Sequence, residues 1–273
     1  MSFRKHLSIP GLLTIIRSVF SAIPEHRKKN IDILLPDALM SAFAMFSLKY
    51  SSLLKFDEER HEKIIQRNLK NLYGINKAPC DTQMRDILDP VDPLELRPAF
   101  KKILNEVQKS GKLEEYKYLG KYYLATVDAT GQYSSNHVNC PECCTKNHKN
   151  GNISYYHQLL AAAIVHPDKR TVIPFAPEAI IKENNATKND CELNASKRLL
   201  EQIKKEHPRL PLLIVEDALY AKAPHIKLLN SLGYRYIIGV KEGDHKYLFK
   251  SVQEKIISNE DNEFEFYTHI ERV

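Results

Sequence analysis

Apolar residues in the first part of the chain recur at the spacing of amphipathic helices. Between Pro36 and Gly74 an apolar side chain returns every three or four positions, as on the buried face of a helix. Residues 81–111 read as two shorter helices, the first capped by Asp81, with a break that contains two prolines. The pattern predicts a helical domain over residues 1–118, in which no clear helix-turn-helix motif stands out.

After Gly120 the pattern changes to short apolar runs that alternate with helical segments. We expect strands at 122–129, 154–165, 170–181, 210–217 and 234–240, and helices at 191–207, 223–233 and 245–257. Three consecutive strands suit an antiparallel meander, whereas the later alternation of helix and strand implies parallel crossovers. The prediction for residues 119–273 is therefore an α/β domain with a mixed sheet and the element order β-β-β-α-β-α-β-α.

Composition and charge narrow the class of protein. Hydrophobic residues make up 43% of the 273 positions and charged residues 27%, which is ordinary for a soluble globular protein. Pro10 and Arg17 interrupt the apolar stretch near the N-terminus, so we expect a cytoplasmic protein without a signal peptide. The net charge is +6, and residues 1–118 hold 20 Lys and Arg against 15 Asp and Glu. This surplus suits DNA binding, although a solvated surface shows the same pattern.

Two aspartates follow apolar strands of the predicted sheet. Asp128 ends the run YLATVD and Asp217 ends LLIVED, and sites in mixed α/β sheets gather beyond the carboxyl ends of strands. If the two strands are parallel neighbours, the carboxylates meet and repel each other unless a cation lies between them. Their hard oxygen atoms favour Mg²⁺ or Mn²⁺, ions that serve phosphodiester chemistry. Side chains alternate along a strand, which turns Glu216 to the opposite face, so we favour Asp217 as the partner of Asp128 in this site. Acids at strand ends also cap helices, which is the competing interpretation.

The sequence around these acids is similar to that of a known enzyme family. The segments TVDATGQYSS, KNDCELNASKRLL and VEDALYAKAPHIKLLNSLGYRYIIGVKEGDHKYLF resemble transposases of bacterial insertion sequences, over roughly residues 120–255. The resemblance implies the RNase H-like fold of DDE enzymes, with Asp128 and Asp217 as the first two catalytic acids and as ligands of the metal. It also implies DNA cleavage at insertion-sequence ends, strand transfer by the freed 3′-hydroxyl, and a homodimer as the expected assembly.

The third catalytic acid of this family, a Glu on a later helix, has no convincing counterpart here. Glu254 lies on the helix after the last expected strand, and Glu263, Glu265 and Glu271 lie in what reads as a further strand. We therefore expect a C-terminally truncated transposase whose third acid is missing. Loss of that acid can leave the enzyme inactive, so Mg²⁺-dependent cleavage is expected only if the third acid is present. Two alternatives stay open: a DNA-binding remnant or regulator without catalysis, and an unrelated metal-dependent nuclease of the same fold.

Three of the five cysteines cluster in an insertion at about residues 134–157, between the first two expected strands. An odd and clustered set of cysteines argues against a disulfide scaffold. Two of them have the C-x2-C spacing of a zinc knuckle, and histidines lie on both sides. The expected zinc ligands are Cys140, Cys143, His148 and His157, with His137 and Cys144 as alternatives to His157. A polar loop with free thiols is the competing interpretation.

Basic side chains near the expected catalytic edge are candidates for contact with DNA phosphates. Lys241, His245 and Lys246 follow the last expected strand, at the same edge as the two acids. Arg198 lies in the basic run KRLLEQIKK on the helix after the meander. Ordinary solvated positions would carry the same charges, so only their place near the acids favours DNA contact.

Overall fold

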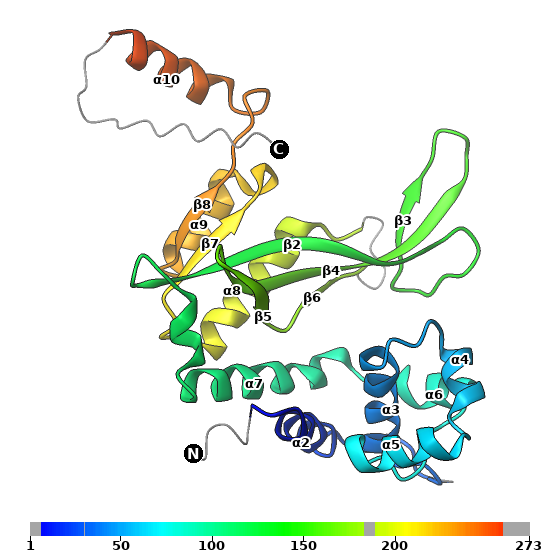
Figure 1. The fold of residues 1–273 in the computed structure, drawn as a ribbon. Helices are drawn as coiled ribbons and strands as arrows, with labels where there is room; N and C mark the ends of the chain where they lie inside the picture. Colours follow the sequence, from blue (N-terminus) through cyan, green and yellow to red (C-terminus); the bar gives the residue numbers. More distant parts are fainter. Residues whose placement is uncertain (1–6, 30, 183–188, 259–273) are drawn as a thin grey trace.

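The protein has a helical N-terminal part and a C-terminal part built on a sheet (Figure 1). The computed structural model describes residues 7–29, 31–182 and 189–258. The helices of the first part are α2 (Ile9–Phe20), α3 (Leu35–Ser47), α4 (Leu53–Glu59), α5 (Lys63–Tyr73), α6 (Asp81–Leu88) and α7 (Arg97–Lys109), with short helical turns η1 (Pro93–Leu96) and η2 (Lys112–Tyr116). Among the described helices, none combines the length and the apolar character needed to cross a membrane.

α2 is a helix that the sequence pattern did not predict. Ser8 caps its start by accepting a hydrogen bond from the backbone N–H of Gly11 at 3.2 Å, and Pro10 lies in its first turn. Proline is well tolerated there, because the first N–H groups of a helix have no partner within it. Pro10 therefore begins a helix in this apolar segment, and Ile16 is buried on its inner face.

The apolar run between Pro36 and Gly74 forms three helices, α3, α4 and α5, separated by two breaks. After α3, Lys49 adopts a positive φ of 60°, and Ser52 then caps α4 by accepting from the N–H of Lys55 at 3.1 Å. Gly74 ends α5 in the left-handed conformation, which its lack of a side chain permits. The apolar faces of these helices form one hydrophobic cluster together with α2, α6 and the start of α7.

The sheet has eight strands: β1 (Lys117–Tyr118), β2 (Tyr122–Ser135), β3 (Cys144–Asn147), β4 (Ile153–His166), β5 (Lys169–Pro174), β6 (Glu178–Ile180), β7 (Leu212–Glu216) and β8 (Arg235–Ile238). Its main path is β3-β4-β2-β7-β8, with β1 beside β2 and with β5 and β6 beside β4. β2 is antiparallel to β4 but parallel to β7, and β7 is parallel to β8. The mixed α/β architecture expected from the sequence is confirmed.

Three helices accompany the sheet: α8 (Glu192–Glu206), α9 (Ala223–Ser231) and α10 (Lys246–Ser258), together with the short turn η3 (Ala218–Tyr220). Leu199 and Leu200 of α8 are fully buried in a second hydrophobic cluster, with Val127 of β2 and Ile214 of β7. α8 therefore covers one face of the sheet. α10 projects away from the sheet (Figure 1).

The observed elements differ from the expected ones in three places. β2 and β4 are each 14 residues long, so β2 continues well past Asp128. Together with β3 they form an arm that extends from the body of the sheet (Figure 1). The third expected strand is divided into β5 and β6 by residues 175–177, where Phe175 is buried in the core and its N–H donates to the carbonyl of Ala162 at 2.9 Å. α8 begins at Glu192, one residue later than expected, and Cys191 is its N-cap.

Candidate catalytic carboxylates and a cysteine-histidine cluster

Asp128 and Asp217 lie where the neighbouring strands β2 and β7 approach the same edge of the sheet. The parallel register ends with Thr126 opposite Val215. Each aspartate lies two residues farther along its chain, so alternation places both at the same level and on the same face. This face is the one opposite α8, and both side chains are exposed to solvent. Two acids that are far apart in the sequence are thus brought together by strand pairing.

Backbone N–H groups hold one oxygen of each carboxylate. Asp128 Oδ1 accepts from the N–H of Ala129 at 2.9 Å, and Asp217 Oδ1 accepts from the N–H of Leu219 at 2.9 Å. The second of these bonds caps η3, so the capping role that competes with a metal-binding role does occur at Asp217. It uses one of the two carboxylate oxygens and leaves Oδ2 as a hard ligand.

Glu216 points to the opposite face and has a different environment. Its side chain is completely buried, and its Oε2 lies 2.7 Å from Nε2 of His225, whose side chain is 3% exposed. The His225 ring packs beside the ring of Tyr220, with centroids 5.2 Å apart. Alternation along β7 therefore separates a structural acid, Glu216, from the exposed acid Asp217.

Tyr220 lies behind this sheet edge and was not anticipated from the sequence. It is 1% exposed, and its hydroxyl has no hydrogen-bond partner among the described residues. Burial raises the pKa of the Tyr220 hydroxyl most strongly, and the carboxylates of Glu192, Glu216, Asp217 and Asp128 raise this pKa further. Both exposed aspartates therefore act on the same buried hydroxyl, which places them in one electrostatic neighbourhood.

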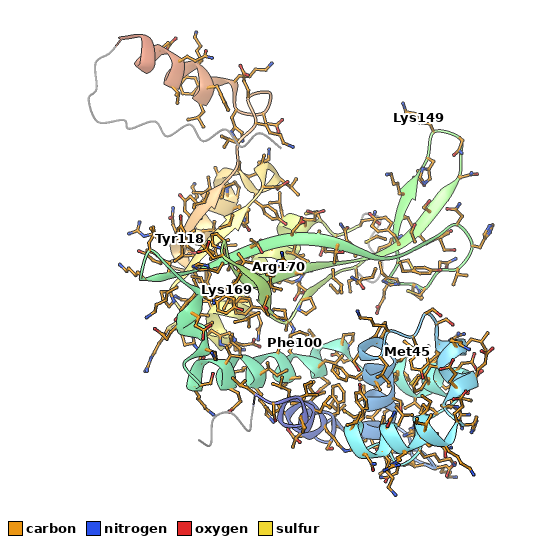
Figure 2. The ribbon with its side chains drawn as sticks, in the orientation of Figure 1. Met45, Phe100, Tyr118, Lys149, Lys169 and Arg170 are labelled. Carbon is orange, nitrogen blue, oxygen red and sulfur yellow. The ribbon has the colours of Figure 1, made fainter. Side chains whose placement is uncertain are left out.

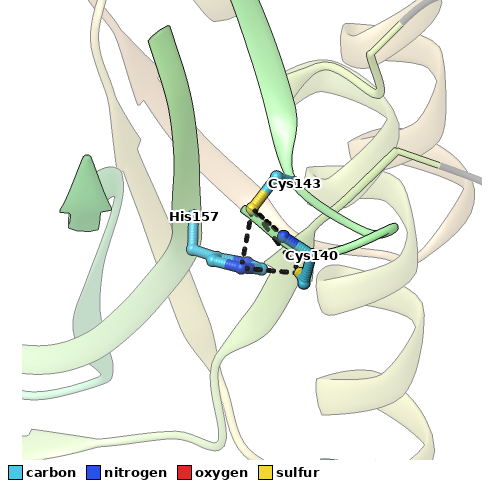
Figure 3. Close-up of side chains that lie close together, drawn as sticks. All are labelled: Cys140, Cys143 and His157. Atoms are coloured by element: carbon cyan, nitrogen blue, oxygen red, sulfur yellow. Dashed lines mark hydrogen bonds between the residues drawn. The ribbon is translucent and has the colours of Figure 1, made fainter. Parts of the chain in front are cut away.

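Cys140, Cys143 and His157 form a compact cluster in the arm (Figure 3). The two Sγ atoms are 3.5 Å apart, and each lies 3.2 Å from Nε2 of His157. Zinc bonds of about 2.0–2.3 Å in a tetrahedron separate ligand atoms by roughly 3.5–3.8 Å, so small outward shifts would admit a metal ion. Burial and the hydrogen bond with Cys143 raise the pKa of the Cys140 thiol. The donor set is one that metal ions of the zinc type prefer.

The remaining expected zinc ligands lie outside this cluster. His148 Nε2 is hydrogen-bonded at 2.6 Å to the Ser154 hydroxyl of the same β3–β4 hairpin, and His148 is not part of the cluster. The Cys144 thiol is buried and donates to the carbonyl of Ile180 at 3.5 Å. His137 is not part of the cluster either, and the described residues supply no fourth His, Cys, Asp or Glu to it.

Several cations lie on the same side of the sheet as the carboxylates. Lys241, His245 and Lys246 follow β8, which is parallel to β7, so their turn leaves the sheet at the edge that carries Asp217. Both lysines are exposed. Lys149, which sequence reasoning did not single out, lies at the tip of the β3–β4 hairpin (Figure 2).

Arg198 has a structural environment. Its Nε donates to Glu178 Oε1 at 2.8 Å and its Nη2 donates to Asp190 Oδ2 at 2.7 Å, while Arg97 of α7 binds the other oxygen of Glu178. Burial acts to raise the pKa of Asp190, but hydrogen bonds from Arg198 and from the N–H of Cys191 outweigh it, so this pKa is lowered. The network joins α7, β6 and α8. The guanidinium of Arg198 is committed to it, and we do not retain Arg198 as a DNA contact.

Of the glutamates considered for a third acid, Glu254 lies within the described residues, and it does not join the pair. Glu254 is exposed on α10, where its Oε1 lies 3.7 Å from Nζ of Lys250, and α10 lies apart from the sheet edge (Figure 1). Residues 263, 265 and 271 lie outside the described residues.

Comparison with solved structures gives a distant similarity. No protein-family model matches the sequence, and no curated protein matches it. Among solved structures, a piggyBac transposase in a synaptic complex with hairpin DNA, determined by cryo-EM, is 14% identical with a TM-score of 0.35. The match covers 84% of this chain and 48% of the transposase chain, so this chain spans about half the length of that protein. A TM-score this low does not establish a common fold.

Proposed function

We propose that the chain is a DNA-cleaving enzyme of the transposase type, in which Asp128 and Asp217 bind a divalent cation at the edge of an RNase H-like sheet. The parallel register of β2 and β7 carries the proposal, because it brings the two carboxylates to one level and one face. The strand order supports the fold, since the central strand β2 has an antiparallel neighbour on one side and two parallel strands on the other. The resemblance around both acids adds insertion-sequence ends as the DNA substrate.

The residues at this edge fit a hard divalent cation. Each aspartate is exposed and offers an oxygen that the backbone N–H groups do not use. A bound Mg²⁺ or Mn²⁺ would supply Lewis acidity toward a phosphodiester and a more acidic water. The N–H groups of Ala129 and Leu219 orient the two carboxylates, and the open face leaves room for a DNA backbone.

The second part of the proposal is a structural zinc ion held by Cys140, Cys143 and His157. The mutual distances of 3.2–3.5 Å and the thiol and imidazole donors support it. Such an ion would tie the loop before β3 to β4, because His157 belongs to β4 and lies opposite Tyr133 of β2. It would hold the shape of the arm and take no part in cleavage.

Nicking of supercoiled plasmid DNA in Mg²⁺ tests the catalytic assignment. Asp128→Asn and Asp217→Asn keep the size of the side chain but remove the charge that holds the cation, so we expect at least about a 100-fold loss in rate. Asp168→Asn is the matched control, since Asp168 lies in the β4–β5 turn and its side chain is 89% exposed. Undiminished cleavage in both site variants would refute the assignment. A wild-type protein that binds DNA and never cuts it would favour the non-catalytic alternative.

Metal analysis tests the zinc site. We expect about one zinc ion for each chain of protein purified under reducing conditions, and its loss in Cys140→Ser and His157→Ala. His148→Ala is the matched control and should keep the metal, because His148 lies outside the cluster. A wild-type protein without zinc, or a Cys140→Ser variant that keeps it, would reject the site.

A further inference from the structure

The helix α5 and the loop after it carry an unusual charge pattern. Residues 63–80 contain Lys63, Arg67, Lys70 and Lys77 but not one Asp or Glu. In a chain with 34 acidic residues, this stretch is a local exception. The basic surplus of the N-terminal part is therefore concentrated at one place.

The structure turns these charges outward along one helix. α5 buries Leu69 and Tyr73 against the helical core, which leaves Lys63, Arg67 and Lys70 exposed. Among the described residues, none of these three cations has an acidic partner. Like charges at this spacing repel each other and weaken a helix by a few tenths of a kcal/mol for each pair, roughly 0.2–0.5 kcal/mol. A polyanion would relieve that repulsion.

The cations line a concave surface, which we call the α5 groove. It is a cavity of about 590 Å³ between α5 and residues 75–78. Its basic side chains are Arg60, His61, Lys63, Arg67, Lys70 and Lys77, and no acidic residue lines it. Asn and Gln side chains lie between them, as in many surfaces that contact nucleic acids.

Hydrogen bonds to a buried carboxylate and to an arginine fix the loop that forms one wall of the α5 groove. Asp37 is 2% exposed, and its Oδ2 accepts from the backbone N–H groups of Asn76 at 3.0 Å and Lys77 at 3.4 Å. Arg60 Nη1 donates to the carbonyl of Ala78 at 2.9 Å. Gly74 turns the chain back beneath α5. The groove is thus formed before any ligand arrives, so that little ordering is needed on binding.

We propose that the α5 groove binds the phosphodiester backbone of duplex DNA. The choice of DNA as the ligand rests on the proposed function. The inference assigns the DNA contact to residues distant in sequence from Asp128 and Asp217. From Lys63 to Lys70 the helix rises about 10 Å. One strand of B-DNA presents about three phosphates over that length. Three cations in a row therefore match an extended polyanion better than a single small anion.

The test is a titration of a fluorescent DNA duplex of about 30 base pairs, of mixed sequence, at several salt concentrations without divalent metal. Each phosphate contact contributes about 0.9 to the slope of log K against log salt. The triple variant Lys63→Gln, Arg67→Gln, Lys70→Gln should lower this slope by roughly 2 to 3 and weaken binding at least about 10-fold at low salt. Arg67→Gln alone should lower the slope by about one.

The matched control is Lys101→Gln, Lys102→Gln, Lys205→Gln, which removes three exposed cations of α7 and α8. It changes the net charge equally and should leave the slope nearly unaltered. Circular dichroism checks that both triple variants keep their helices. An unchanged slope in the α5 variant, or equal losses in both variants, overturns the proposal. Because binding is measured without metal, a failure of the cleavage proposal leaves this result unaffected.

Discussion

Asp37 offers the sharpest test of how the helical part is held together. Its carboxylate is buried and connects three elements: Oδ1 accepts from Arg17 Nη2 at 2.7 Å, and Oδ2 accepts from the N–H groups of Asn76 and Lys77. Arg17 comes from α2, Asp37 lies in the first turn of α3, and the two N–H groups follow α5. The perturbation is Asp37→Asn, which keeps the shape of the side chain and removes its charge.

The expected loss follows from these contacts. A hydrogen bond to a charged group contributes about 1.5–3 kcal/mol, and removing one partner of a buried ion pair costs about 3–5 kcal/mol. Two facts reduce the figure for Asp37→Asn: the asparagine keeps one acceptor oxygen, and the Arg17 side chain is 29% exposed, so water can solvate it. We therefore expect a loss of about 3 kcal/mol in the free energy of unfolding.

Urea denaturation followed by circular dichroism at the helical band measures this loss. The protein has no tryptophan, so the helical signal is the better reporter. Asp32→Asn is the matched control, because Asp32 pairs with Lys77 in the same region but the two side chains are 66% and 55% exposed. An exposed pair of this kind should contribute less than about 0.5 kcal/mol. Equal losses for Asp37→Asn and Asp32→Asn would refute the reasoning.

Three further predictions concern other parts of the fold. Leu199→Ala should lower the free energy of unfolding by about 3 kcal/mol, because Leu199 is fully buried and the substitution leaves a cavity in the core. Urea denaturation measures this loss, and a value below about 1 kcal/mol would contradict the prediction. Glu178→Gln should cost about 2–4 kcal/mol by the same assay, since it removes the charged partner that Arg97 and Arg198 share and leaves Arg198 with Asp190 alone; a neutral effect would speak against the network. The hydrogen bonds from Arg27 lower the pKa of Glu25 from 4.5 to about 2. The ionised Glu25 therefore stabilises the fold by about 1 kcal/mol above pH 4.5, and this contribution is lost as the pH falls toward 2. Thermal unfolding measured at a series of pH values between about 5 and 2 should show a smaller fall in melting temperature for Glu25→Gln than for the wild type.

The meeting of Asp128 and Asp217 could be predicted because it depends on short-range patterns. Each acid follows an apolar run of strand length, so the two carboxylates were expected to meet if those strands are parallel neighbours, and β2 and β7 are. Alternation then decides which of Glu216 and Asp217 faces solvent, and the structure gives those two residues opposite environments. None of these steps needs knowledge of side-chain packing.

Other features depended on contacts that a sequence pattern does not contain. Pro10 looked like an interruption of an apolar segment, but its position in the first turn of α2 makes it compatible with a helix. Phe175 belonged to an apolar run expected as one strand, yet residues 175–177 divide that run into two strands. β3 has only four residues, and its pairing with β4 is what makes it a strand.

The candidate zinc ligands show the same limit at the scale of single side chains. The spacing of Cys140 and Cys143 predicts a knuckle, but spacing does not tell which histidine faces it. His148 follows closely in sequence and lies in the hairpin, where it binds a hydroxyl. His157 is farther along the chain, and the antiparallel pairing of β4 with β2 carries it back to the cysteines. Proximity in sequence therefore favours His148, whereas strand pairing is what brings His157 to the two cysteines.

On the proposed assignments, the two metal sites lie on one pair of strands, and their different ligand atoms select different metal ions. Along β4, His157 lies four residues before Ala161, the partner of Asp128, which corresponds to about 13 Å on the same face of the strand. Thiols and an imidazole select zinc, whereas carboxylate oxygens select Mg²⁺ or Mn²⁺, so neither ion competes strongly for the other site. The register of β2 and β4 between the two sites is continuous except for a bulge near Gly131. The zinc ion would therefore fix the arm relative to the carboxylates, while the pairing of β2 with β7 alone positions the carboxylates themselves.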